Sequence, residues 1–147
     1  MIGEFRGETR WLSNFAKVLI YYNGVAYEST EGAYQAQKTM DEEVRRQMSI
    51  MSPAGCKSLG MALKLRPDWD DVKLKIMEDV NRIKFSQEPF KSKLLATGNE
   101  HLVEGNDWGD KYWGVVNGQG ENRLGSIIMK IREELRNEKG TVQISDT

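Results

Sequence analysis

Apolar residues return at helical spacing in two long stretches of the chain. In residues 71–87 they recur every three or four positions with charged residues between them, which predicts an amphipathic helix with one buried face. A second stripe follows Asn122, which we expect to cap the last helix. The two stripes consist of Val72, Ile76, Val80 and Ile83, and of Leu124, Ile127, Ile128, Ile131 and Leu135.

Capping residues predict four shorter helices. Thr30 is the expected N-cap of the first, because its hydroxyl can accept a free N–H of the first turn. Ser52 followed by Pro53 opens the third, and Gly98 ends the fourth, since proline fits a first turn and glycine fits a helix end. The expected ranges are 31–40, 41–51, 53–63 and 89–97.

Extended structure is expected mainly near the N-terminus. The Asn-Gly pair at 23–24 separates residues 18–22 from 25–27 and is a strong hairpin signal. Residues 2–5 form a further extended piece, while the glycine-rich segment 101–121 is expected to be irregular or short-stranded. Strands and helices do not alternate as in a parallel sheet. The pattern therefore predicts a mainly α, multihelical fold with a small N-terminal β-element and disfavours a Rossmann fold.

Composition limits the classes of protein that remain. The chain has 147 residues, 39% hydrophobic and 29% charged, as in an ordinary globular domain. We expect one domain over residues 1–147, with a polar, flexible tail after about residue 138. The net charge of −1 gives no general attraction to nucleic acid or an anionic membrane.

Cysteine and histidine are too few for a metal centre or a disulfide. Cys56 and His101 are the sole residues of their types, so we expect no metal site and a reducing compartment. Cys56 is either a small core residue or a reactive thiolate. No apolar stretch has the length of a signal peptide core or of a bilayer-spanning helix. The expected location is the cytoplasm, with no membrane partner.

One polar stripe in the first short helix has two interpretations. In STEGAYQAQK, residues 29–38, Glu31, Gln35 and Lys38 share a helical face. Such a stripe is typical of a solvated surface. The alternative is that it holds a carboxylate in place for chemistry.

The glycine-rich segment also has two interpretations. Trp108, Tyr112 and Trp113 lie close together among acidic residues and glycines. They either form a wall on which a flat ring stacks or pin the loop to the core. The following GQGENRLG, 118–125, is either a tight turn or a set of backbone N–H groups that bind an anion.

Several blocks of the sequence occur together in one known family. FRGETRWLSNF, YESTEGAYQAQK, LLATG, LVEG, DKYWG and GENRLGSIIMKIREEL fall in the order found in the NADAR superfamily. The chain resembles this superfamily, in particular its YbiA-like branch, from about residue 5 to 135. The resemblance implies a mainly α fold and hydrolysis of an N-glycosidic bond without a metal or redox cofactor.

The resemblance also implies a class of substrate. The YbiA-like branch acts on ribosylamine-type, phosphorylated intermediates of the riboflavin pathway. Other members remove ADP-ribose from nucleic-acid bases, as in toxin or phage conflict. A small ribosylated or nucleotide-like molecule is therefore the expected partner, with ADP-ribosylated nucleic acid as the alternative. A third alternative is a non-catalytic ADP-ribose or nucleotide-binding module.

Site residues follow from the matching motifs. The glutamate of the S-x-E-H-x-x-Q block, the family's leading catalytic residue, is Glu31, and the D-x-x-W-G block supplies Asp110 as the second carboxylate. The expected substrate-binding residues are Arg6, Asn14, Phe15, Gln35, Lys38, Lys84, Trp113, Gly114 and Asn122. Among these, Arg6, Lys84 and the 118–122 turn are phosphate candidates, although Arg6 and Lys84 could instead form surface ion pairs.

Three positions depart from the family pattern. The histidine after the glutamate is Gly32, the arginine after Leu-Gly is Met61, and the glycine of WG-x-G is Val116. These changes are expected to alter how substrate, and phosphate in particular, is held. They leave Glu31 and the D-x-x-W-G block in place.

Overall fold

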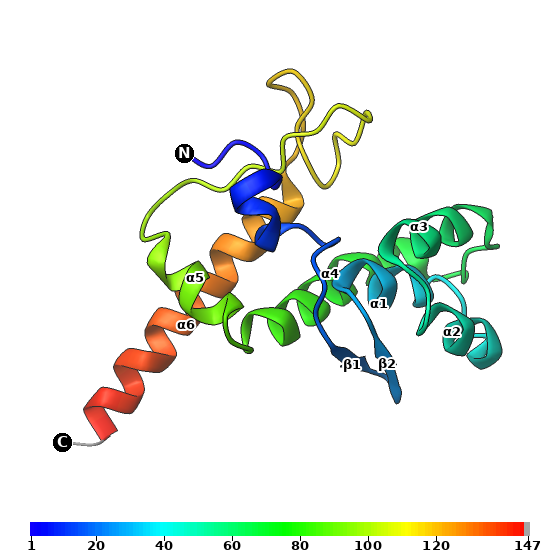
Figure 1. Cartoon of the computed structure of the whole chain (residues 1–147), viewed down its shortest axis with the longest axis horizontal. Coiled ribbons are helices and arrows are strands. Elements are labelled where there is room, and N and C mark those ends of the chain that lie inside the picture. The colour runs from blue at the N-terminus through cyan, green and yellow to red at the C-terminus, as the bar shows by residue number, and fades with distance from the viewer. Residues whose placement is uncertain (146–147) are drawn as a thin grey trace. The chain divides into compact units, whose positions relative to one another are not determined.

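The computed structural model describes residues 1–145, without the side chains of 139–145 (Figure 1). The chain forms two compact units. The terminal unit consists of Met1–Trp11 with Phe85–Thr147, and the mid-chain unit is Leu12–Lys84. Both are mainly helical, as the sequence predicts. The single domain and the flexible tail after about residue 138 stay predictions, and residues 146–147 of that tail lie outside the described part of the chain.

The predicted hairpin is confirmed in the mid-chain unit. Strands β1 (Ile20–Tyr22) and β2 (Val25–Tyr27) pair antiparallel. Asn23 and Gly24 between them have φ of 50° and 83°, the left-handed conformation that a two-residue hairpin turn requires. The Asn23 amide also donates to Oε1 of Gln37 at 3.0 Å.

Helix α1 (Thr30–Ala36) lies at the centre of several contacts within the mid-chain unit. It contacts both strands and two further helices, and all seven of its residues are buried. Its N-cap is Ser29, whose Oγ accepts the Gly32 N–H at 2.9 Å, so the prediction of Thr30 was wrong. Ser29 is extended, with φ of −160°, as a cap must be, while the Thr30 hydroxyl donates to Asn14.

The other helices of this unit begin close to the predicted positions. Helix α2 (Glu42–Met48) has Asp41 as its N-cap, and α3 (Pro53–Ala62) has Ser52. Helix α4 (Trp69–Phe85) carries the first predicted stripe. Within that stripe Ile76 and Val80 are buried, whereas Val72 and Ile83 are half-buried.

The terminal unit is built on two helices and an irregular segment. Helix α5 (Phe90–Ala96) packs on α6 (Arg123–Ser145) (Figure 1), and all five apolar residues of the second predicted stripe are buried. Segment 101–121 is irregular, as predicted, apart from isolated bridges such as Gly105–Val115. A 3-10 helix, η1 (Gly7–Leu12), was not predicted. Among the residues described, no helix combines the length and apolar character needed to cross a bilayer.

Candidate active site

Glu31 is a buried carboxylate. It lies in the first turn of α1 and is only 8% exposed. Its backbone N–H donates to the carbonyl of Asn14 at 3.0 Å, which joins the start of the helix to the 13–15 turn. Because Glu31 is buried, the interpretation of its stripe as a solvated surface is wrong. Burying a carboxylate is costly and needs compensation from its surroundings.

Asn14 and Phe15 form the turn beneath this helix start. Asn14 is buried, and its Oδ1 accepts from the Thr30 hydroxyl at 2.9 Å and from the Asn81 amide at 3.4 Å. The Lys57 ammonium stands 5.9 Å from the centre of the Phe15 ring. Asn14 therefore joins α1 to α4, and Phe15 contributes an aromatic face beside a cation.

Lys84 supports the same turn from α4. It is fully buried, and its ammonium donates to the Ser13 carbonyl at 2.7 Å. Burial lowers the pKa of Lys84 from 10.5 to about 7, because a low-dielectric environment disfavours the charged form. The surface ion pair considered for Lys84 is therefore wrong. Its role in binding phosphate stays a prediction.

Gln35 and Lys38 follow Glu31 along α1. Gln35 is 5% exposed and lies against Gly60 of α3, where a β-carbon would stand 2.0 Å from Oε1 of Gln35. Lys38 is half-buried just beyond the helix. Burial lowers the pKa of Lys38, the negative charge of Glu31 opposes that shift, and Lys57 adds to it. One carboxylate and two ammonium groups therefore share an electrostatic environment.

Cys56 is a core residue behind α1. It is fully buried, and its thiol donates to the Met48 carbonyl at 3.3 Å. Burial, with Glu31 and Glu28 adding to it, raises the pKa of Cys56 to about 11, so the reactive-thiolate alternative is not supported. A β-carbon on Gly32 would lie 3.3 Å from the Cys56 sulfur. The family histidine would therefore need room that Cys56 occupies.

Asp110 organises the tryptophan segment of the terminal unit. Its Oδ1 accepts the N–H groups of Tyr112 at 3.1 Å and Trp113 at 2.9 Å. The Asn106 side chain binds both the N–H and the carbonyl of Asp110. Trp113 is half-buried and meets Tyr112 edge to face, with centroids 4.8 Å apart. The loop is thus held by its own polar side chains.

Gly114 is required by a close backbone approach. A β-carbon at this position would stand 2.2 Å from the Glu104 carbonyl and 2.6 Å from the Asn106 amide nitrogen. No other residue type fits there without movement of the neighbouring chain. The glycine of the D-x-x-W-G block is therefore explained by packing.

Arg6 is exposed but engaged. It pairs with Asp107 at 2.9 Å, and its guanidinium stands 5.3 Å from the centre of the Trp108 ring. It also lines a hollow of about 590 Å³ between the N-terminal segment and the loops that include Asn106 and Gly118. An anion that binds Arg6 would have to share it with Asp107. The surface ion pair considered from the sequence is thus present.

Asn122 does not cap α6 with its side chain, contrary to prediction. It is buried with φ of 50°, its amide donates to the Leu102 carbonyl and its Oδ1 accepts from the Glu104 N–H, both at 2.9 Å. The neighbouring N–H groups are also occupied, which favours the tight-turn interpretation over anion binding. Glu121, Asn122, Arg123 and Leu124 donate to the carbonyls of Lys111, Gly114, Tyr112 and Trp113.

The predicted site residues thus fall into two groups. Within the described part of the chain, no cluster of three His, Cys, Asp or Glu side chains is arranged to hold a metal ion. Lys57 and Gly60 were missed, although both belong to the GCKSLG segment. The mid-chain unit holds Asn14, Phe15, Glu31, Gln35, Lys38 and Lys84, and the terminal unit holds Arg6, Asp110, Trp113, Gly114 and Asn122.

Comparison with known proteins identifies the family. Residues 4–136 match the NADAR domain model, and the chain belongs to the NADAR domain family. It is 38% identical over 132 residues to N-glycosidase YbiA of Escherichia coli K12, covering 86% of this chain and 82% of that protein. The corresponding Shigella boydii protein is 39% identical with the same coverage.

A solved structure and a longer relative extend the comparison. The fold is similar to the NMR structure of E. coli YbiA, with a TM-score of 0.82, 34% identity, and coverage of 95% of this chain and 89% of that one. A riboflavin biosynthesis protein of Vibrio vulnificus is 35% identical over 136 residues, which is 86% of this chain but 35% of that protein. The mainly helical YbiA-like fold expected from the sequence is confirmed.

Proposed function

We propose that the protein is an N-glycosidase that hydrolyses the bond between ribose C1′ and a nitrogen of its substrate. The observation that carries the proposal is the buried Glu31 carboxylate, 8% exposed and within the field of Lys38. The glutamate lies in the motif that matches the family, and the E. coli and Shigella boydii relatives are named N-glycosidases.

The proposed reaction develops positive charge on the ribose. As the C1′–N bond breaks, the sugar becomes oxocarbenium-like, and an adjacent carboxylate stabilises that charge. The oxygen of water then bonds to C1′, the leaving nitrogen takes a proton, and free base and ribose result. Glu31 stabilises the cation and orients or deprotonates the water.

Gln35 and Lys38 support this carboxylate. The ammonium of Lys38 favours the ionised form of Glu31. The Gln35 amide holds the carboxylate or a ribose hydroxyl. Its Oε1 is buried without a hydrogen-bond partner among the described residues, so a donor such as a sugar hydroxyl would satisfy an otherwise costly acceptor.

Asp110 and Trp113 are proposed to act on the leaving base. Asp110 protonates the base or binds ribose hydroxyls, and Trp113 stacks on the heterocycle. The remaining substrate-binding residues are proposed to shape the walls around the substrate, and their packing and hydrogen bonds described above support this role. They are Asn14, Phe15, Gly114 and Asn122.

The proposed substrates are phosphorylated ribosylamine intermediates of the riboflavin pathway. Their support is the relatives, which include a riboflavin biosynthesis protein. Arg6 is the leading phosphate ligand, since a guanidinium can bind phosphate with two N–H groups. To bind phosphate it would give up its ion pair with the exposed Asp107, and ion pairs at the surface are weak. Lys84 is the second.

A paired assay tests this function. The protein is incubated with a ribosylaminopyrimidine phosphate and, separately, with an ADP-ribosylated oligonucleotide, and free base is measured by mass spectrometry. We expect release from the first and its loss in Glu31→Gln, with the fold retained. Glu28→Gln, which changes an exposed carboxylate nearby, is the matched control.

Each other outcome has a defined meaning. Release from the oligonucleotide alone assigns the activity to ADP-ribosylated bases. Binding without release from either substrate assigns a non-catalytic module. Unchanged turnover in Glu31→Gln overturns the proposed mechanism.

A further inference from the structure

The C-terminal end of α1 presents a concentrated set of backbone carbonyls. The last carbonyls of a helix lack partners within it, and the helix dipole places partial negative charge there. Here the end is buried, because Ala36 and Gln37 are both fully inaccessible. Water therefore cannot satisfy these carbonyls, and other groups must donate to them.

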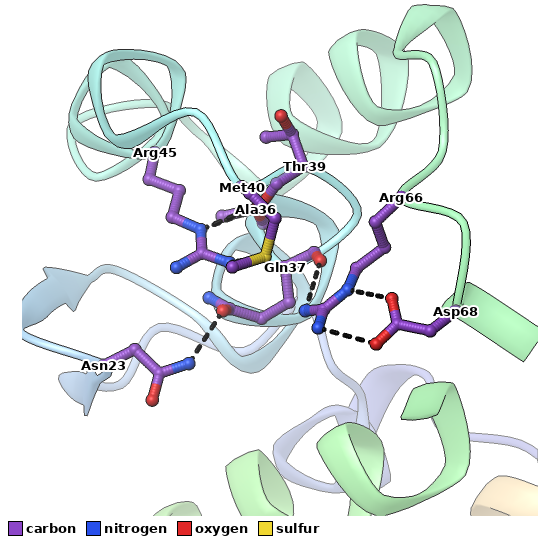
Figure 2. Close-up of polar contacts among 8 residues, drawn as sticks. All are labelled: Asn23, Ala36, Gln37, Thr39, Met40, Arg45, Arg66 and Asp68. Carbon is purple, nitrogen blue, oxygen red and sulfur yellow. Dashed lines mark hydrogen bonds and ion pairs between the residues drawn. The ribbon is translucent and has the colours of Figure 1, made fainter. Parts of the chain in front are cut away.

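Gln37 and Lys38 bind the carbonyls of residues 33–35. Two arginines bind the carbonyl of Ala36, the last residue of α1, and carbonyls just beyond it (Figure 2). Nε of Arg45 donates to the carbonyls of Ala36 at 3.3 Å and Thr39 at 3.0 Å. Arg66 donates from Nη1 to the Gln37 carbonyl at 3.5 Å and from its backbone N–H to the Lys38 carbonyl at 2.8 Å. Four successive carbonyls are thereby bound.

Arg45 depends more than Arg66 on these carbonyls as hydrogen-bond acceptors. It is 7% exposed and, within the described chain, forms no ion pair with a carboxylate, so the carbonyls are its main acceptors. Arg66 pairs with Asp68 through two hydrogen bonds of 2.6 Å and 3.0 Å. A buried guanidinium without an acidic partner is costly, which indicates that its contacts with this segment matter.

Lys38 lies between the two carbonyls that Arg45 holds. Its ammonium lies in the fields of Glu31 on α1 and Lys57 on α3, while Arg45 and Arg66 approach its backbone. Arg45 binds the chain on both sides of Lys38, at the carbonyls of Ala36 and Thr39. Arg45 therefore fixes the backbone from which the Lys38 side chain extends.

We propose that Arg45 is a positioning residue of the active site: by binding the carbonyls of Ala36 and Thr39 it fixes Lys38 beside Glu31. That Arg45 holds the chain on both sides of Lys38 stands on the hydrogen bonds, and that Lys38 lies near Glu31 stands on the effect of the Glu31 charge on the Lys38 pKa. Its catalytic consequence rests on the proposed function, because it assumes that Lys38 supports the Glu31 carboxylate. Arg45 itself touches no reacting atom.

The first test follows the titration of Lys38 without any substrate. Lysines are dimethylated with ¹³C-formaldehyde, and the Lys38 signal is assigned by its absence in Lys38→Arg. Arg46, exposed and paired with Glu43 on the same helix, provides the control variant Arg46→Met. We expect the Lys38 pKa below its ordinary value in the wild type and in Arg46→Met, and shifted upwards in Arg45→Met, where the freed segment is hydrated. An unchanged titration in Arg45→Met overturns the proposal.

The second test is a double-mutant cycle on turnover. If Arg45 acts through Lys38, Arg45→Met lowers kcat about tenfold when Lys38 is present but less than about twofold in a Lys38→Met background. Arg46→Met leaves kcat within about twofold in both. Equal losses in both backgrounds would show that Arg45 acts elsewhere, and the inference would fail.

Two provisions keep the tests decisive. If Arg45→Met does not fold, Arg45→Lys replaces it, since an ammonium keeps the charge but cannot present the guanidinium fork, and an intermediate shift is expected. If the wild type releases no base, the proposed function fails, but the titration still decides whether Arg45 positions Lys38.

Discussion

The side chain of Gln35 occupies the space that a β-carbon would take on Gly60. The ideal β-carbon position on Gly60 lies 2.0 Å from Oε1 and 2.8 Å from Cδ of Gln35. At this contact between the two helices, α1 contributes the side-chain amide of Gln35 and α3 contributes only the backbone of Gly60. The family-motif glutamine is thus positioned by a glycine on another helix.

Replacing that glycine tests whether the position of Gln35 matters. Gly60→Ala is expected to lower kcat, because the new methyl group displaces the Gln35 amide. Stability should change by less than about 1 kcal/mol, since alanine favours the helix by a similar amount and the displaced group is the end of a flexible side chain. Turnover and urea unfolding are measured in parallel. In a Gln35→Ala background the substitution should have little further effect on turnover, and a loss of equal size there would contradict this explanation.

Two substitutions separate the roles of Asp110. Asp110→Asn keeps an oxygen that accepts the Tyr112 and Trp113 N–H groups but removes the charge. Asp110→Ala removes both. If Asp110 acts as an acid, Asp110→Asn should already lower kcat by about 10²-fold or more, while the Trp113 indole signal in an NMR spectrum stays near its wild-type position. Wild-type turnover in Asp110→Asn would reduce its role to holding the loop.

Lys84 predicts an unusual dependence of stability on pH. Its pKa is about 7 in the folded protein, against 10.5 for an unperturbed lysine, so between these values the unfolded chain binds more protons. The contribution of Lys84 to the free energy of unfolding therefore rises with pH above about 7, by up to about 1.4 kcal/mol per pH unit. Below about pH 7 the lysine is charged in both states, and the folded protein bears the full cost of burying that charge.

Urea unfolding of the wild type and Lys84→Met at about pH 6 to 9 measures this effect. The wild type should gain stability relative to the variant as pH rises, although the variant also leaves the Ser13 carbonyl without its donor. Lys64→Met, which removes an exposed lysine, is the control variant for the loss of a lysine. A pH-independent difference for Lys84→Met would show that the amine is hydrated.

Because Gly32 lies against the Cys56 sulfur, we expect substitutions at these two positions to have non-additive effects on stability. Gly32→His, which restores the residue common in the family, should destabilise the fold by about 1–3 kcal/mol because it overpacks against the Cys56 sulfur. Adding Cys56→Ala should recover part of that loss. Thermal unfolding of the two single variants and the double variant gives the coupling energy. Purely additive losses would place the clash elsewhere.

Periodicity predicted the long helices well because each has one buried face. The stripes of α4 and α6 were found from spacing, and Asn23-Gly24 gave the hairpin from the conformational demands of its turn. Helix α1 was the failure of this method. Since all seven of its residues are buried, a face that reads as polar in the sequence is enclosed by other elements, and only the family resemblance indicated that Glu31 is not a surface residue.

Side chains that bind distant backbone were not predictable from local pattern. Ser29 and Thr30 both carry a hydroxyl, and what separates them is that Thr30 reaches Asn14, far away in the sequence. Asn122 looked like a cap but binds residues 102–104 instead. The short η1 helix has no apolar repeat or cap to mark it. In each case the deciding contact lies outside the window that a sequence pattern covers.

The complete enclosure of α1 has a consequence for evolving new specificity. Because no residue of this helix faces solvent, changes of size in it destabilise the fold, and substitutions that keep the size of the side chain are the ones that leave an effect on chemistry to be seen. Variant libraries aimed at a new substrate should therefore alter α1 and its α3 neighbours in matched pairs.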